Sequence, residues 1–206
     1  MQNKGRYIFS IIRSGILFCL ILCSMPSLSA QTEGDLRSGD LLFVRAQQSA
    51  MEQAIAASTG NYTHVALVER DSTGRLFLIE AIPSAGVHRI PYTPDYGPCE
   101  RYRLAQPFDT AAVIRRAKAY LGLPYDQAFQ PGDQALYCSE LIYYCFLDAD
   151  GRPLFEAIPM NFRNARGRLP RYWRRHFKRL GLPVPEQVPG TNPTDLAHSP
   201  LLIKLP

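Results

Sequence analysis

The sequence predicts an α+β fold, and three observations support this class. Apolar residues make up 46% and charged residues 20% of the 206-residue chain, a composition typical of a globular protein with a hydrophobic core. A run of short β-type segments, separated by turn residues, occupies residues 40–104. Segments with helical spacing lie on either side of the strands, so strands and helices are grouped and do not alternate regularly.

The first thirty residues differ from the rest and predict a secretory signal peptide. Lys4 and Arg6 precede the short apolar run GILFCLILC, and the segment ends in PSLSA, so cleavage is expected after Ala30. The apolar run is too short to span a bilayer comfortably, although an uncleaved anchor is the alternative. We therefore expect an exported protein of the periplasm or cell envelope. Without the leader, 20 basic and 18 acidic residues remain, which does not favour nucleic-acid binding.

Strands are expected where aliphatic, β-branched and aromatic residues run between turn signals. We predict five strands, at residues 40–46, 62–70, 75–82, 86–92 and 99–104. The second strand carries His64 near its start, and the third carries Glu80 among apolar neighbours. The turn DSTG between these two strands predicts a hairpin, in which the two side chains can lie beside each other.

Helices are predicted from the spacing of apolar residues and from capping residues. They run from Ser49 to a stop at Gly60, from Asp109 or Thr110 to a stop at Gly122, and from Cys138 to Gly151. The many prolines near the end predict a loop-rich, basic C-terminal extension over residues 153–206. Residues 31–206 are thus expected to form a single domain.

Two cysteines stand seven residues apart in the third predicted helix. Cys138 lies in its first turn, where free backbone N–H groups and the helix dipole favour a thiolate. Cys145 lies two turns deeper, in the apolar run LIYYCFL, where a thiol is inert. About 10 Å of helix separates them, too far for a disulfide. Cys138 is therefore the candidate nucleophile, although a structural role is the simpler interpretation of such a cysteine considered alone.

A catalytic cysteine needs a base and a group that orients the base. His64, at the start of a strand, is the best candidate base, although a capped histidine is the ordinary interpretation of that position. Glu80 lies in a strand expected to be buried, and a buried carboxylate needs a partner. The three residues would form a triad in the chain order His, Glu, Cys.

Four segments in this order resemble the permuted papain-like amidases of the YaeF/YiiX type, relatives of the NlpC-type cell-wall peptidases. They are SGDLLFVR, THVALV, LIEAIPSAGV and PYDQAF…YCSELIYYCF, between residues 39 and 146. The resemblance implies a circularly permuted papain-like fold, with an antiparallel sheet or small barrel packed against helices. It also implies Cys138 as nucleophile, His64 as base and Glu80 as the orienting acid. Tyr137 resembles a family position and is a candidate for oxyanion or substrate binding, whereas Glu140 is expected to be structural.

Other hydrolase classes lack their signatures in this chain. The remaining histidines form no metal-ligand spacing, no G-x-S-x-G elbow is present, and there is no C-x-x-C pair. We expect neither a metal nor another cofactor. Two classes remain: an exported cysteine hydrolase that cleaves an amide, and a papain-like binding module that has lost turnover.

The substrate class stays open between a cell-wall peptide and an acyl-lipid or N-acyl amide. Residues 161–179 contain eight Lys or Arg residues and no acidic residue, with aromatic residues between them. A solvated basic face packed through its aromatics is the usual meaning of such a segment. The alternative is a surface that attracts an anionic component of the envelope.

Overall fold

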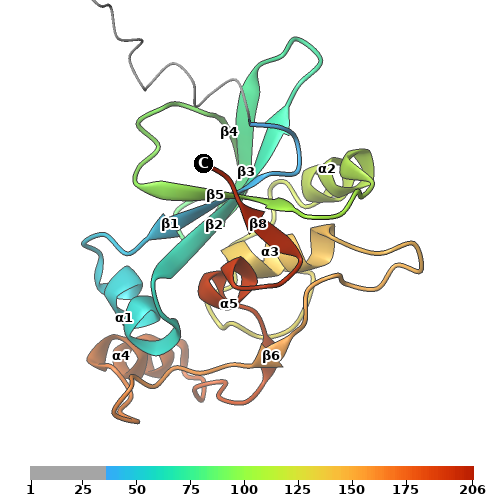
Figure 1. Ribbon diagram of the computed structural model, residues 1–206. Helices are drawn as coiled ribbons and strands as arrows, with labels where there is room; N and C mark the ends of the chain where they lie inside the picture. Colours follow the sequence, from blue (N-terminus) through green and yellow to red (C-terminus); the bar gives the residue numbers. More distant parts are fainter. Residues whose placement is uncertain (1–35) are drawn as a thin grey trace, which may run out of the picture.

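The computed structural model describes residues 36–206, so the predicted signal peptide lies outside the described residues. The α+β class is confirmed: one six-stranded antiparallel sheet packs against helices (Figure 1). The strands are β1 (Leu41–Arg45), β2 (Tyr62–Arg70), β3 (Leu76–Ile82), β4 (Gly86–Pro91), β5 (Cys99–Leu104) and β8 (Leu202–Lys204), in the spatial order β4-β3-β2-β1-β5-β8. The helices are α1 (Ala50–Thr59), α2 (Thr110–Ala119), α3 (Cys138–Cys145), α4 (Arg171–Leu180) and α5 (Pro193–Ala197).

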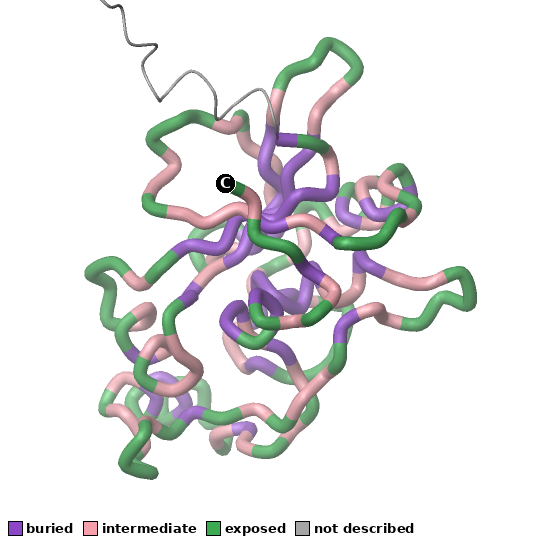
Figure 2. Tube along the Cα trace, viewed as in Figure 1, coloured by how far each residue is buried: buried purple, intermediate pink, exposed green. Residues whose placement is uncertain are grey.

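The predicted strands all form, because each alternates side chains between two apolar layers. One layer lies between the sheet and the helices α2, α3 and α5, and Figure 2 shows that the central strands and α3 are the most buried parts. On the other face Leu42, Val68 and Leu78 pack under the segment that follows β4. None of the helices in residues 36–206 is long and apolar enough to cross a bilayer.

The helices α1 and α2 start at the predicted capping residues, but α2 and α3 end before the predicted residues. The Ser49 side chain accepts a hydrogen bond from the N–H of Glu52, in a reciprocal capping box, and Asp109 caps α2 through the N–H of Ala112. Helix α2 already ends at Ala119, because the chain turns to bond with β4.

Helix α3 was predicted to continue to Gly151, and this is wrong: it ends at Cys145. Phe146 leaves the helical conformation, and residues 147–153 form a turn with a bridge between Leu147 and Pro153. Gly151 occupies the left-handed region at φ 79°, so it shapes that turn and does not end the helix.

The C-terminal segment is an integral part of the domain. Strand β8 pairs with β5 and forms one edge of the main sheet, and α5 packs against β2. Helix α4 begins inside the basic segment 161–179 and ends one residue beyond it, and no helix was predicted there. Its buried side includes Trp173, His176 and Phe177, which build a second, aromatic core with Phe129 and Phe162. The short strands β6 (Ile158–Pro159) and β7 (Pro189–Gly190) pair with each other beside this core.

Candidate active site

Cys138 is the first residue of α3. The preceding Tyr137 is extended and makes no side-chain cap to the helix, so no side chain of the N-cap competes for the first N–H groups. The thiol is buried, with 5% of the residue exposed, yet it lies in the wall of a cleft. The thiol and the free N–H groups of the first turn therefore lie together at the start of α3.

A β-bulge in β2 places His64 in the same cleft. Val44 pairs with His64 and Arg45 with Tyr62, so Thr63 is an extra residue on β2. A bulge re-aims the side chains on either side of it. Tyr62 therefore joins the core between sheet and helices, whereas His64 faces the cleft at the end of the strand.

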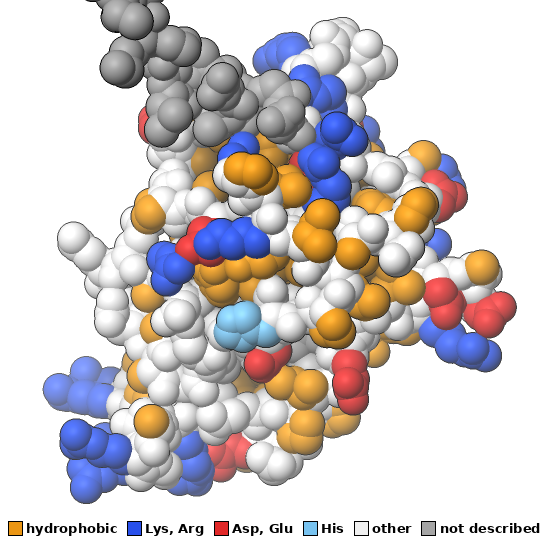
Figure 3. Space-filling model, viewed as in Figure 1, with side chains coloured by type: hydrophobic (Ala, Val, Ile, Leu, Met, Phe, Trp, Pro, Cys, Tyr) orange, Lys and Arg blue, Asp and Glu red, His pale blue; other side chains and the backbone are white. Residues whose placement is uncertain are grey.

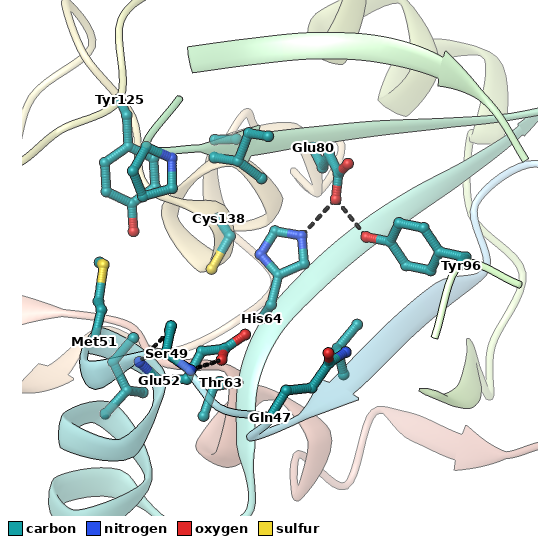
Figure 4. Close-up of a pocket in the computed structure, with 15 residues that line it drawn as sticks. Gln47, Ser49, Met51, Glu52, Thr63, His64, Glu80, Tyr96, Tyr125 and Cys138 are labelled. Atoms are coloured by element: carbon teal, nitrogen blue, oxygen red, sulfur yellow. Dashed lines mark hydrogen bonds and ion pairs between the residues drawn. The ribbon is translucent and has the colours of Figure 1, made fainter. Parts of the chain in front are cut away.

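Glu80 holds the imidazole of His64 from the side opposite Cys138. The His64 Nε2 and Glu80 Oε2 atoms are 2.5 Å apart, and the Glu80 side chain is only 4% exposed. The pairing of Leu67 with Ile79 makes His64 and Glu80 diagonal neighbours on one face of the hairpin. Figure 4 shows His64 between Cys138 and Glu80, with one ring nitrogen on the side of Cys138 and the other bonded to Glu80.

Two further residues bind Glu80, and neither is marked by a motif in the sequence. The Nε2 of His88 lies 3.1 Å from Glu80 Oε1, and the Tyr96 hydroxyl donates to Oε2 (Figure 4). Glu80 and His88 are directly opposed in the β3–β4 hairpin, so the short turn between these strands was a usable signal. Burial opposes ionisation, but the hydrogen bonds from His64, Tyr96 and His88 hold the pKa of Glu80 below its usual value.

The charge state of His64 follows from its two neighbours. Burial alone would lower its pKa, but hydrogen bonds with Cys138 and Glu80, and the negative charges of both, raise the pKa of His64 to about 10. The imidazole is therefore protonated at neutral pH. The three side chains are ordered as thiol, imidazole and carboxylate, an arrangement that suits a nucleophilic cysteine.

The cleft has a volume of about 290 Å³ and a mixed lining. Met51 and Ile55 contribute apolar atoms, Gln47 and Glu52 contribute polar ones, and Tyr125 forms the wall beside Cys138. The Tyr125 hydroxyl points toward the cleft (Figure 4), and Tyr125 was not among the residues that the sequence singled out.

The side chain of Tyr137 does not line the cleft that contains His64. Its hydroxyl accepts a hydrogen bond of 3.1 Å from the N–H of Thr191, and its ring lies in the aromatic core. Glu140, in the first turn of α3, is buried next to Asp126, and burial followed by that charge raises the pKa of Glu140 to about 8.

The three cysteines in residues 36–206 are all free. Cys145 is fully buried in the main core, and burial raises its pKa to about 12, as expected of an inert thiol. Cys99 is partly exposed at the start of β5. Only Cys138 therefore has both a histidine partner and access to the cleft within the described part of the chain.

Comparisons with known proteins agree on one family and one fold. The sequence pattern of the family described as "Permuted papain-like amidase enzyme, YaeF/YiiX, C92 family" matches residues 35–205. The Uncharacterized protein YiiX of Escherichia coli (strain K12) is 26% identical over 152 residues, covering 68% of this chain and 70% of that protein. The crystal structure of metalloprotein yiiX from Escherichia coli O157:H7 has a TM-score of 0.68 at 22% identity, covering 82% of this chain and 96% of that one.

Proposed function

Because this chain belongs to the family of permuted papain-like amidases of the YaeF/YiiX type, we propose that it is a cysteine hydrolase that cleaves an amide bond through Cys138, His64 and Glu80. One observation carries the residue assignment. The imidazole of His64 lies between the thiol and the carboxylate, and its Nε2 is engaged by Glu80, so its other nitrogen faces Cys138.

The proposed reaction has two halves, acylation of Cys138 and hydrolysis of the resulting thioester, and His64 transfers one proton in each. The Cys138 thiolate attacks the amide carbonyl carbon, and His64 gives its proton to the leaving nitrogen as the C–N bond breaks. Water then attacks the thioester carbonyl carbon, and the now neutral His64 takes a proton from the water. The C–S bond breaks, which releases the acid and returns Cys138 as the thiolate beside protonated His64. We assign the negative oxygen of each tetrahedral intermediate to the free N–H groups at the start of α3 and to the Tyr125 hydroxyl, which line the cleft with Cys138.

No step is assigned to a metal ion, although the solved relative from Escherichia coli O157:H7 is titled a metalloprotein. Within residues 36–206, no three His, Cys, Asp or Glu side chains are placed to hold a metal ion together. Both oxygens of Glu80 are already engaged by His64, His88 and Tyr96. The donor set near Cys138 therefore does not fit a metal centre.

The proposed setting is the bacterial envelope, with a cell-wall peptide or an N-acyl amide as substrate. The composition of the first thirty residues supports export. Figure 3 shows Lys and Arg side chains gathered over the end of the molecule that holds α4, whose Arg171, Arg174, Arg175, Lys178 and Arg179 are all exposed. We propose that this surface attracts an anionic wall polymer or phospholipid head groups.

The test compares hydrolysis with thiol reactivity. The protein and a Cys138→Ala variant are incubated with muropeptides and with N-acyl lipids, and products are identified by mass spectrometry. Product formation that depends on Cys138 supports the proposal. Iodoacetamide labelling near neutral pH tests the alternative, a binding module without turnover. Slow, uniform labelling of the three cysteines, together with no product from either substrate class, would favour that alternative.

A further inference from the structure

A second cavity lies on the other side of Cys138 from His64. It is lined by residues of α1, the start of α3 and the C-terminal segment, including Ile55, Phe129, Ser139, Phe162 and Trp173. Helices α1 and α4 lie side by side at this end of the molecule (Figure 1). Cys138, Thr63 and Tyr125 line both this cavity and the His64 cleft, whereas His64 and Glu80 line only the cleft. The thiol thus sits at the junction of two spaces.

The cavity contains polar atoms that have no partner. Five buried side-chain atoms in residues 36–206 lack a hydrogen bond, and four of them belong to residues that line this one cavity. They are Thr63 Oγ1, Ser139 Oγ, Trp173 Nε1 and Thr191 Oγ1. Each of these residues is at most 5% exposed. A buried polar atom without a partner is unfavourable, so such a concentration in one place indicates that a ligand completes the bonds.

The lining also sets the charge and size of that ligand. Among the described residues that line the cavity none is charged, so a neutral group fits and an ionised one does not. The volume of about 40 Å³ has room for about three or four water-sized groups. Trp173 Nε1 can only donate, so the ligand must bring a hydrogen-bond acceptor.

The position of His64 decides which part of an amide substrate enters. His64 must reach the leaving nitrogen to protonate it, and His64 lines only the cleft. The leaving amine therefore occupies the cleft, and the acyl part that stays on the sulfur points into the cavity. We propose that the cavity is an acyl subsite for short, uncharged acyl groups that carry an oxygen acceptor, and that it excludes long alkyl chains.

The assignment of the cavity to the acyl part rests on the proposed amidase function. Binding of a ligand in the cavity does not depend on that function, and two readouts separate the two claims. The first is kcat/KM for the 4-nitroanilides of glycolic, propionic, hexanoic and octanoic acids, in which glycolyl and propionyl differ only by a hydroxyl in place of a methyl group. We expect glycolyl to be preferred over propionyl by about 10-fold or more, and hexanoyl and octanoyl to be cleaved at least about 10-fold more slowly than glycolyl.

Variants assign the preference to the cavity. Trp173→Phe keeps an aromatic ring but removes the Nε1 donor, and it should reduce the glycolyl preference with little change for propionyl. Met160→Ala, which widens the cavity wall, should raise the relative rate for hexanoyl. The matched control is Tyr172→Phe on the same helix, since Tyr172 lines a different, solvent-facing hollow and not this cavity. It should leave the preference unchanged.

The second readout needs no turnover. Trp173 is the single tryptophan of the chain, so its fluorescence reports on the cavity directly. In a Cys138→Ala variant, glycolamide should change this emission at concentrations where propionamide does not. Hydrolysis without glycolyl preference, or with octanoyl as the best substrate, would overturn the subsite. A fluorescence response to glycolamide without hydrolysis of any anilide would preserve the cavity as a binding site and refute the amidase function. Absence of both the fluorescence response and the hydrolysis would refute both the subsite and the amidase function.

Discussion

Replacing Glu80 by Gln isolates the charge of the carboxylate from its geometry. Glu80 Oε2 accepts from both His64 and Tyr96, and Oε1 faces His88. Two donors on one oxygen fix the orientation of a glutamine amide, with its oxygen toward His64 and its NH₂ group toward His88. The His64 tautomer that leaves its other nitrogen facing Cys138 is therefore retained.

The magnitude follows from the change in hydrogen-bond type. A hydrogen bond to a charged group contributes about 1.5–3 kcal/mol, and a neutral one about 0.5–1.5 kcal/mol, so Glu80→Gln removes about 1–2 kcal/mol. Since 1.36 kcal/mol corresponds to one pKa unit, the pKa of His64 should fall by about one unit from its raised value. At neutral pH we expect kcat/KM to fall about 10-fold. Glu80→Ala leaves buried donors unpaired and should lower kcat/KM by about 100-fold or more.

The assay is the pH profile of two rates, hydrolysis of glycolyl 4-nitroanilide and alkylation of Cys138 by iodoacetamide. Loss of the imidazolium proton should end hydrolysis at alkaline pH, so the decline should occur about one pH unit lower in Glu80→Gln than in the parent protein. Thermal unfolding checks that all three proteins are folded. Identical rates and profiles in the parent and Glu80→Gln would show that the charge has no role. A folded Glu80→Gln as inactive as Glu80→Ala would show that the amide does not orient His64.

Three further predictions concern single features of the fold. Cys138→Ala should abolish hydrolysis while keeping the thermal transition, whereas Cys145→Ala should keep hydrolysis and lose about 1 kcal/mol of stability, measured by urea unfolding, because it leaves a small void in the core. Glu140 has a folded pKa raised to about 8, so the protein should lose stability as the pH rises from about 4.5 through 8. Glu140→Gln should flatten that decline in melting experiments at pH 5 and pH 9, and an unchanged decline would contradict the assignment. Co-sedimentation of Cys138→Ala with anionic liposomes and with wall sacculi should weaken at high salt and in a charge-reversed variant. The reversed variant changes Arg168, Arg171, Arg174 and Arg175 to Glu. If binding is unchanged by both salt and charge reversal, α4 has a structural role only.

The sequence predicted the elements that depend on local signals. Strands β1 to β5, the capped starts of α1 and α2, and the position of Cys138 at a helix start all follow from residue patterns within about ten positions, whereas β6, β7, β8 and α5 were not predicted. The predicted end of α3 was wrong because Phe146 leaves the helix and packs in the core, and no local pattern indicates this. Helix α4 was missed because its buried aromatics are interleaved with arginines, and the charge of the segment hid the apolar face.

The candidate site was predictable in part for the same reason. His64 and Glu80 belong to neighbouring strands, and the hairpin brought them together as expected. Tyr96 and Tyr125 come from loops whose course depends on tertiary packing, so no spacing rule pointed to them. Tyr137 lines the second cavity and not the His64 cleft, and its hydroxyl accepts from the N–H of Thr191, so its role in oxyanion or substrate binding stays a prediction.

The separation of the site's parts along the chain has a consequence for how the protein folds. Glu80 lies 16 residues from His64 and 8 residues from His88, so these contacts form within a meander of adjacent strands. Cys138 joins them only when α3 docks on β2 and β3. A much longer stretch of chain, which contains β5 and α2, separates Cys138 from these strands. Contacts of long sequence separation form slowly and late. The acid–base half of the site is therefore expected to assemble before α3 docks, and the thiol to remain exposed to oxidants until then. Cysteine oxidation during refolding should then fall on chains in which β2, β3 and β4 are already paired.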